Sequence, residues 1–297
     1  MIRRRVPRRS GPRPVSEPPL IVAHRGASSL LAEHTLAAYQ AALETGADGL
    51  ECDVRLSRDG YLVCVHDRRV DRTSDGRGNV SELELSRLES LDFSSWHDRW
   101  PDSADALVSD EPYLAGVAPD RAPEGGGVLT LPTLLSLVTD AGRPMHLLIE
   151  TKHPTRYAGL VEKELVRALR RFGLARSAGA RPAARSSPVT VLVMSFAAIA
   201  LRRIRVLAPD LPTVLLVERL LPLRRGGELP AGTEIVAPAL ATLRHDPRFV
   251  ARSHAHGHRV FVWTVDEPDD LAFVLSLGVD AVISNNPAAA LRARDGG

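Results

Sequence analysis

The sequence predicts an α/β fold with parallel strands, of the size of a (β/α)8 TIM barrel, from three observations. Short aliphatic runs alternate with amphipathic segments along the chain, as in parallel sheets whose strands are joined by helices. The chain has 297 residues, and a single α/β barrel commonly uses about 250. Only 4% of the residues are aromatic, so an aliphatic core is expected.

The aliphatic runs are the predicted strands. In chain order they are Leu20–His24, Gly49–Leu56, Tyr61–His66, His146–Thr151, Val189–Phe196, Thr213–Val217, Glu234–Pro238, Arg259–Val265 and Asp280–Ser284. Several segments between them carry apolar residues at helical spacing and are predicted helices. The clearest are Thr35–Thr45, Leu160–Phe172, Ala197–Ala208 and Asp269–Leu277. The strands number one more than an eight-stranded barrel needs.

The surplus strand is explained by a short turn between the second and third runs. Ser57-Arg58-Asp59-Gly60 separates them, whereas parallel neighbours need a crossover of roughly a dozen residues. A turn of this length and composition predicts a β-hairpin, which leaves eight strands for the barrel.

The register of the hairpin is predicted as well. We expect Leu56 to pair with Tyr61, which places Glu51 opposite His66. The two-residue period of a strand also puts Glu51 and Asp53 on one face. An acid and a histidine are therefore expected side by side, with Asp53 opposite Cys64.

Two stretches depart from the alternation of strands and helices. Residues 67 to about 128 are expected to form an insertion over one end of the barrel, with the Gly/Pro-rich Ala118–Gly127 as an exposed loop. Ala175–Pro188 is rich in Ala, Arg and Ser and predicts a flexible loop. We expect residues 19–297 to form a single domain that contains the insertion.

The charge of the chain is unevenly distributed. Residues 1–13 carry six arginines and no acid, and subtracting these from the net charge of +2 leaves −4 for the remainder. A basic body suited to nucleic acid is therefore absent. We expect residues 1–18 to be a disordered, solvated leader, although such a tail can also touch phosphates or a membrane surface.

Targeting and membrane signals are not predicted. The first apolar run after the arginines, Leu20–Ala23, is shorter than a secretory signal requires. No stretch reaches the length of a membrane span, so we expect a cytoplasmic protein without stable membrane insertion. Cys52 and Cys64 fit this expectation as buried thiols rather than a disulfide.

Chemically competent residues gather at the ends of three predicted strands. They are His24-Arg25-Gly26 with Glu33 soon after, Glu51-Cys52-Asp53 with the hairpin partner His66-Asp67, and Glu150-Thr151-Lys152. Barrel active sites lie at the carboxyl ends of the strands. The clusters therefore indicate metal-assisted phosphoryl chemistry.

The acids of these clusters indicate a divalent cation. Glu51, Asp53 and Glu150 offer hard oxygen ligands, which suit Mg²⁺ or Ca²⁺ better than a soft metal. Such a cation would relieve the repulsion among three carboxylates and polarise a phosphoryl oxygen. Taken singly, an acid pair in a strand is more often a solvated face, so the prediction depends on the clusters occurring together.

The remaining polar residues suit proton transfer and phosphate binding. Imidazole titrates near pH 6.5, so His24 and His66 are candidates for an acid and base pair. Arg25 offers a forked donor for phosphate oxygens, and Lys152 offers a point charge. A lone histidine after a strand is more often structural, and again the joint pattern carries the hypothesis.

At this point the chain resembles the glycerophosphodiester phosphodiesterase family over nearly its whole length after residue 20. The matching motifs are His24-Arg25-Gly26, Glu33-His34-Thr35, Gly46-Ala47-Asp48, Glu51-Cys52-Asp53-Val54, Asp59-Gly60, His66-Asp67, Leu131-Pro132-Thr133-Leu134, Glu150-Thr151-Lys152, Ser195-Phe196, Trp263-Thr264-Val265 and Gly278-Val279-Asp280.

The resemblance implies a distorted (β/α)8 barrel, related to the phosphatidylinositol phospholipase C-like phosphodiesterases. It implies that glycerophosphodiesters, small-molecule substrates of glycerol and lipid metabolism, are hydrolysed to sn-glycerol 3-phosphate and an alcohol with a divalent cation. The implied site residues are His24 and His66 for acid and base, Glu51, Asp53 and Glu150 for the metal, Arg25 and Lys152 for phosphate, Trp263 for the pocket wall, and Glu33 near the metal or its waters.

One departure from the family pattern lies next to this site. The family commonly has Pro-Glu-Asn-Thr where this chain has Ala32-Glu33-His34-Thr35. His34 either assists the site or caps the following helix, and capping is the favoured interpretation. The leaving alcohol, the choice between Mg²⁺ and Ca²⁺ and the oligomeric state are not predicted.

Two other functions remain open. A lysophospholipase D-type lipid phosphodiesterase would use the same residues, and the apolar Trp96, Trp100 and Tyr113 in the insertion are compatible with it. A catalytically inactive binding module is less favoured because every catalytic position holds a competent residue. Nucleic acid is disfavoured as a partner because the basic leader lacks interleaved aromatic residues.

Overall fold

Eight parallel strands close into a barrel in the computed structural model, which describes residues 18–96, 126–153, 155, 157–176, 187–219, 226–230 and 232–296. The barrel strands are β1 (Leu20–His24), β2 (Gly49–Leu56), β4 (Met145–Thr151), β5 (Val189–Ser195), β6 (Thr213–Val217), β7 (Ile235–Pro238), β8 (Arg259–Val262) and β9 (Ala281–Ser284). Each pairs with the next, and β9 pairs with β1. The predicted (β/α)8 fold is confirmed.

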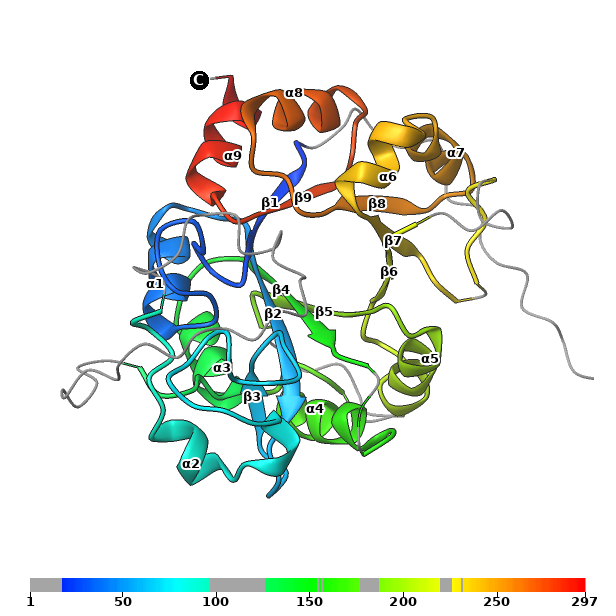
Figure 1. Ribbon diagram of the computed structural model, residues 1–297. Helices are drawn as coiled ribbons and strands as arrows, with labels where there is room; N and C mark the ends of the chain where they lie inside the picture. Colours follow the sequence, from blue (N-terminus) through cyan, green and yellow to red (C-terminus); the bar gives the residue numbers. More distant parts are fainter. Residues whose placement is uncertain are drawn as a thin grey trace, which may run out of the picture.

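Helices surround the barrel on its outside (Figure 1). They are α1 (Leu36–Glu44), α2 (Leu85–Glu89), α3 (Leu131–Thr139), α4 (Leu160–Arg171), α5 (Ala198–Leu207), α6 (Leu240–His245), α7 (Phe249–Ala255), α8 (Pro268–Ser276) and α9 (Pro287–Asp295), with a 3-10 turn at Val80–Glu82. Among the described residues no helix joins β6 to β7, while two helices join β7 to β8. The barrel therefore departs from strict alternation.

Aliphatic side chains fill the two layers of the core. Val22, Leu148, Val214 and Phe261 belong to the cluster formed by one face of the strands. Other clusters lie between the opposite strand faces and the helices, with Tyr39 among the largest fully buried side chains. Successive residues of a strand therefore point into alternate layers. The polar residues near the strand ends face the barrel mouth as a result.

The hairpin is present, but its predicted register is wrong by one residue. β3 (Leu62–Cys64) runs antiparallel to β2, and Leu56 pairs with Leu62 rather than with Tyr61. The cause is a three-residue loop: Gly60 N donates to Ser57 O, and Gly60 has a φ of 88°. A turn followed by a left-handed glycine takes one residue more from the second strand. Glu51 is therefore not paired with His66.

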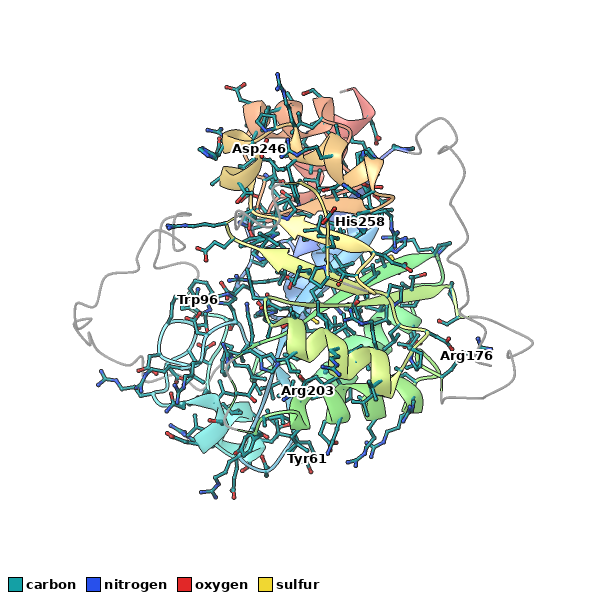
Figure 2. The ribbon with its side chains drawn as sticks, turned by 90° about the vertical axis from the view of Figure 1, so that its right-hand side faces the viewer. Tyr61, Trp96, Arg176, Arg203, Asp246 and His258 are labelled. Carbon is teal, nitrogen blue, oxygen red and sulfur yellow. The ribbon has the colours of Figure 1, made fainter. Side chains whose placement is uncertain are left out.

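The described part of the insertion has a small core of its own. Val70, Val80, Leu88 and Phe93 pack together with Val63 of β3, so this segment covers the hairpin. Figure 2 places Trp96 of the insertion and Arg176, which follows α4, at opposite ends of the barrel.

Several predictions concern segments outside the described residues and are untested. These segments are the leader, most of Ala118–Gly127 and of Ala175–Pro188, and the residues Trp100 and Tyr113. The domain limits are untested as well.

Two smaller predictions concern helices and thiols. None of the described helices has both the length and the apolar character that crossing a bilayer requires. Cys52 and Cys64 are buried and are not joined in a disulfide.

Candidate active site

Three buried carboxylates converge at the carboxyl ends of neighbouring strands. Glu51 and Asp53 come from β2 and Glu150 from β4, and Asp53 is the register partner of Glu150. One oxygen of each lies within 4.8 Å of the others, and the three residues are 2%, 1% and 7% exposed. We call these residues the acidic triad. Their shared face agrees with the two-residue period expected for β2.

The charges around the acidic triad only partly balance it. Lys152 Nζ lies 2.9 Å from both Asp53 Oδ1 and Glu150 Oε2. Burial opposes ionisation of Asp53, yet Lys152 and other nearby cations hold its pKa well below the usual range. Burial and the charge of Asp53 raise the pKa of Glu51 well above its usual range and that of Glu150 to about 7.

The raised pKa values of Glu51 and Glu150 show whether the acidic triad suits a metal ion. Three hard oxygen donors lie within reach of a single ion, and two of them are reluctant to ionise without further positive charge. A divalent cation would supply that charge, and Mg²⁺ and Ca²⁺ prefer such oxygen ligands. The acidic triad therefore fits a divalent cation.

The loop after β1 turns sharply to bring Arg25 over the acidic triad. Arg25 and Gly26 have left-handed φ angles of 57° and 92°. The main-chain N–H of Arg25 donates to Glu51 Oε2 at 3.1 Å, and its Nε lies 3.3 Å from Asp53 Oδ2. A side chain at Gly26 would meet Ala38 at 2.7 Å, so only glycine fits there. The predicted phosphate donor thus contacts the predicted metal ligands.

His24 has a neutral partner that fixes its tautomer. Its Nδ1 lies 2.7 Å from Asn285 Oδ1, and Asn285 Nδ2 donates to Asp266 Oδ2 at 2.7 Å. Since Asp266 accepts from the amide nitrogen, the amide oxygen faces His24 and accepts a hydrogen bond from its Nδ1–H. The lone pair on Nε2 therefore points into the site, 4.0 Å from Glu51. Burial, with a smaller contribution from Arg25, lowers the pKa of His24 to about 3.

His66 has a charged partner instead. Its Nδ1 lies 2.7 Å from Asp67 Oδ1, and the His66 side chain is 34% exposed against 10% for His24. Asp67 is held in turn by Arg72, whose Nε donates to Asp67 Oδ2 at 2.7 Å. The two predicted catalytic histidines therefore lie in different electrostatic surroundings.

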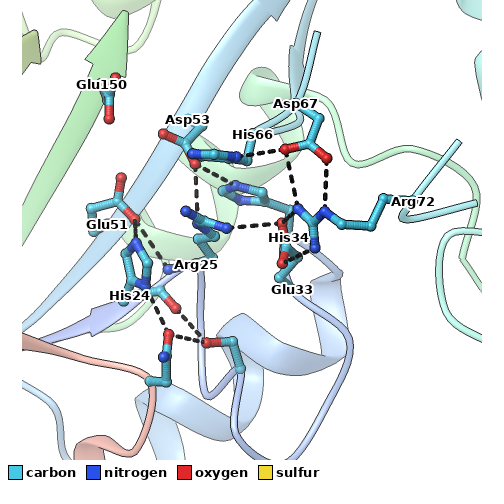
Figure 3. Close-up of polar contacts among 12 residues, drawn as sticks. His24, Arg25, Glu33, His34, Glu51, Asp53, His66, Asp67, Arg72 and Glu150 are labelled. Carbon is cyan, nitrogen blue, oxygen red and sulfur yellow. Dashed lines mark hydrogen bonds and ion pairs between the residues drawn. The ribbon is translucent and has the colours of Figure 1, made fainter. Parts of the chain in front are cut away.

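Glu33 lies between two arginines, as Figure 3 shows. It accepts from Arg25 Nη1 at 3.1 Å and from Arg72 Nη1 and Nη2 at 2.9 and 2.8 Å. Burial opposes its ionisation, but Arg25 and Arg72 lower its pKa. Glu33 and Asp67, which we call the arginine-bound pair, are thus both ionised by protein cations. Glu33 orients Arg25 and is not one of the triad.

His34 does not cap the helix, so the favoured interpretation of this residue was wrong. The cap of α1 is Thr35, whose side chain accepts from Ala38 N. His34 Nε2 instead lies 3.0 Å from Asp53 Oδ2, and its Nδ1 lies 2.8 Å from the Tyr39 hydroxyl. The left-handed φ of 61° at His34 turns its side chain inward. The residue therefore contacts the site directly.

Comparisons with known proteins show the family of this chain. The model of the glycerophosphoryl diester phosphodiesterase family matches residues 24–289. The chain belongs to this family. A probable glycerophosphodiester phosphodiesterase 1 of Mycobacterium tuberculosis is 46% identical over 269 residues, covering 91% of this chain and 90% of the relative. The glycerophosphodiester phosphodiesterase of Bacillus subtilis is 31% identical over 276 residues, covering 90% and 84%.

Solved structures support the fold of this family member. A phosphodiesterase from Oleispira antarctica, in complex with the product sn-glycerol 3-phosphate, has a TM-score of 0.72 and 23% identity, covering 94% of this chain and 97% of its own. A putative glycerophosphoryl diester phosphodiesterase from Silicibacter pomeroyi has a TM-score of 0.72 and 24% identity, covering 94% and 93%. The predicted family and the enzyme class, glycerophosphodiester phosphodiesterase, are confirmed.

Trp263 of this phosphodiesterase follows β8 and lines a cavity of about 660 Å³ together with Glu218 and Thr242. Its Nε1 donates to Ala237 O at 2.8 Å, and its ring meets Phe196 edge-on at 5.5 Å. The indole is therefore fixed in orientation by the barrel. The described lining of this cavity includes neither the acidic triad nor the two predicted catalytic histidines, so the role of Trp263 in the substrate pocket stays a prediction.

Three residues of the site were missed by reasoning from the sequence. Arg72 lies in the insertion, whereas Asp266 and Asn285 follow β8 and β9. Asn285 was identifiable in principle because it follows the last predicted strand, as the other site residues follow theirs. Arg72 follows no strand, and only its partners reveal it.

Proposed function

We propose that this phosphodiesterase hydrolyses glycerophosphodiesters to sn-glycerol 3-phosphate and an alcohol, using Mg²⁺ or Ca²⁺ held by the acidic triad. The observation that carries the proposal is the pair of histidines beside the triad, His24 next to Glu51 and His66 next to Asp53 (Figure 3). The product bound by the Oleispira protein supports the same substrate class. A bound cation would supply Lewis-acid polarisation of a phosphoryl oxygen.

The phosphate would be bound by Arg25 and Lys152. The Arg25 guanidinium is positioned by Glu33 and Asp53, and Lys152 is positioned by Asp53 and Glu150. Both cations are buried, so their charges are weakly screened by water. A phosphodiester anion would therefore be drawn between these two residues and the triad.

The surroundings of the histidines suggest which is base and which is acid. His24 is neutral with its Nε2 lone pair free, so it accepts the proton of the attacking hydroxyl as a new P–O bond forms. His66, whose Nδ1 lies beside the Asp67 carboxylate, is oriented to serve as the acid and donates a proton to the leaving alkoxide as the second P–O bond breaks. Water and the glycerol 2-hydroxyl are both competent nucleophiles with these residues.

The experiment that tests the function is release of glycerol 3-phosphate from glycerophosphocholine. The purified protein would be freed of metal with a chelator and then assayed with added Mg²⁺ or Ca²⁺. Release that returns with one cation supports the proposal and identifies the metal. No release with either cation would reject hydrolysis of this substrate.

A lysophospholipase D-type activity is the second candidate, because apolar side chains are exposed near the carboxyl ends of strands. Leu30, Phe196 and Ile199 are among the exposed large apolar residues, and Phe196 contacts Trp263. Hydrolysis of lysophosphatidylcholine with the same metal dependence would establish this activity. An inactive binding module would hydrolyse neither substrate. A cytoplasmic location and a role in glycerol and lipid metabolism remain predictions.

A further inference from the structure

A second cavity, of about 220 Å³, lies beside the active site. Its polar lining consists of Arg55, Arg68, Ser81, Thr155 and Tyr157. None of the described residues that line it is acidic. We call it the arginine cavity.

The arginine cavity adjoins the proposed acid of the reaction. Arg55 Nε and Nη2 donate to the main-chain oxygen of His66 at 3.0 and 2.7 Å. Arg55 lies two positions after Asp53 on β2 and therefore on the same strand face. Arg68 lies two positions after His66, and Thr155 lies three after Lys152. The segments that carry the catalytic residues thus also form the cavity wall.

Positive charge dominates this cavity. Arg55 is half-buried, and its guanidinium is held by the main-chain oxygen of His66. Within the described part of the chain, Arg68 is exposed, and no acidic side chain there pairs with its guanidinium. Two cations facing one cavity without an acid in its wall favour the entry of an anion.

We propose that the arginine cavity binds an anionic substituent of the leaving alcohol, such as a carboxylate. This inference rests on the proposed function, because it takes His66 as the residue that protonates the leaving alcohol. The leaving group would then lie on the His66 side of the phosphorus, and the cavity adjoins His66 through Arg55. The Ser81 hydroxyl would complete the donors around the anion, while the Thr155 hydroxyl donates to Ala158 O. The cavity thus makes the enzyme selective among glycerophosphodiesters.

A matched pair of substrates tests the proposal. Glycerophosphoserine and glycerophosphoethanolamine differ by one carboxylate, on the leaving alcohol. We expect wild-type kcat/KM to favour glycerophosphoserine by about tenfold at low salt, as charge-assisted hydrogen bonds would provide, and the preference to shrink at high salt. Arg68→Gln should abolish the preference while leaving glycerophosphoethanolamine hydrolysis unchanged. Arg69→Gln, an exposed neighbour outside the cavity lining, is the control and should keep the preference.

The outcomes separate this proposal from the proposed function. Equal kcat/KM for the two substrates in the wild type, or a preference that survives Arg68→Gln, would overturn the anion site while leaving the phosphodiesterase activity intact. If neither substrate is hydrolysed with Mg²⁺ or Ca²⁺, the reaction itself is wrong for them. Calorimetric Kd values on the chelated wild type and Arg68→Gln then decide the cavity: tighter glycerophosphoserine binding that needs Arg68 supports it, and equal binding rejects it.

Discussion

Two sets of carboxylates in one site are treated in opposite ways by their neighbours. In the arginine-bound pair, Glu33 accepts two hydrogen bonds from the Arg72 guanidinium and one from Arg25. Asp67 accepts from Arg72 and lies against His66. The pKa values of both acids are lowered as a result, although burial opposes this.

The acidic triad shares two cations among three acids. Lys152 lies between Asp53 and Glu150, and the Arg25 guanidinium lies beside Asp53. Glu51 accepts only a main-chain N–H, that of Arg25, among the contacts of the described residues. Burial raises the pKa of Glu51 and Glu150, and the charge of Asp53 adds to the effect. The protein therefore neutralises the arginine-bound pair with its own cations and leaves the acidic triad short of positive charge. Such a shortage in a buried cluster is typical of a functional site.

The largest expected effect on turnover comes from removing His66, which lies beside Asp67 of the arginine-bound pair. His66→Ala should lower kcat on glycerophosphocholine by about 10²-fold or more, because general acid catalysis is lost. A substrate with a p-nitrophenol leaving group should suffer much less, since that anion leaves without a proton. His24→Ala should slow both substrates. Near wild-type turnover of glycerophosphocholine by His66→Ala would remove His66 from the mechanism.

Removing one ligand tests the acidic triad. Glu150→Gln should raise the cation concentration for half-maximal activity by about tenfold or more, since even outer residues of metal sites contribute that much to affinity. The measurement is a cation titration of activity, repeated as direct calorimetric binding. Glu164→Gln, which removes a half-buried carboxylate of α4 that bonds Arg167, is the control. An unchanged titration curve would refute the ligand role of Glu150.

Removing Arg72 should leave the arginine-bound pair short of positive charge, as the acidic triad is. Arg72→Gln leaves Glu33 and Asp67 without their shared partner, so kcat is expected to fall by about tenfold, as for outer residues that orient a site. Arg72→Lys keeps the charge but not the forked geometry and should be intermediate. Arg77→Gln, an exposed arginine of the same segment, is the control. If Arg72→Gln keeps full kcat, the pair needs no arginine.

The strands and the acidic triad could be predicted because local pattern decides them. Leu20–His24, Gly49–Leu56 and Thr213–Val217 begin and end where the aliphatic runs do. In a parallel barrel the strand ends meet at one face, so acids following neighbouring strands come together. Asp53 and Glu150 are nearly a hundred residues apart in the chain and still follow this rule.

The remaining parts depend on loops, whose conformations are set by distant partners. The Asn285 amide is oriented by Asp266 toward His24, 261 positions away in the chain. Arg72 bonds Glu33 across 39 positions. The hairpin register turned on one left-handed residue, Gly60. No period or propensity in the sequence encodes these contacts, and His34 was misread for the same reason.

The smallest expected effect is a pH dependence of stability that differs between the acidic triad and the arginine-bound pair. The folded pKa of Glu150 is raised from 4.5 to about 7 by burial and Asp53. Between these values the folded, metal-free protein binds a proton that the unfolded chain has released, so the contribution of Glu150 to stability falls as pH rises. The arginine-bound pair has lowered pKa values and loses its contribution only on acidification, below about pH 4.

The measurement is the melting temperature of chelated wild type and Glu150→Gln from pH 5 to 8. Glutamine cannot ionise, so the variant should gain on the wild type by a few degrees as pH rises. Other titrating groups, including the buried His24, are common to both proteins and cancel in the difference. Added cation should reverse the gain, because it stabilises the ionised triad of the wild type. A pH-independent difference would mean that Glu150 is ionised without metal, and the two sets would no longer be distinct.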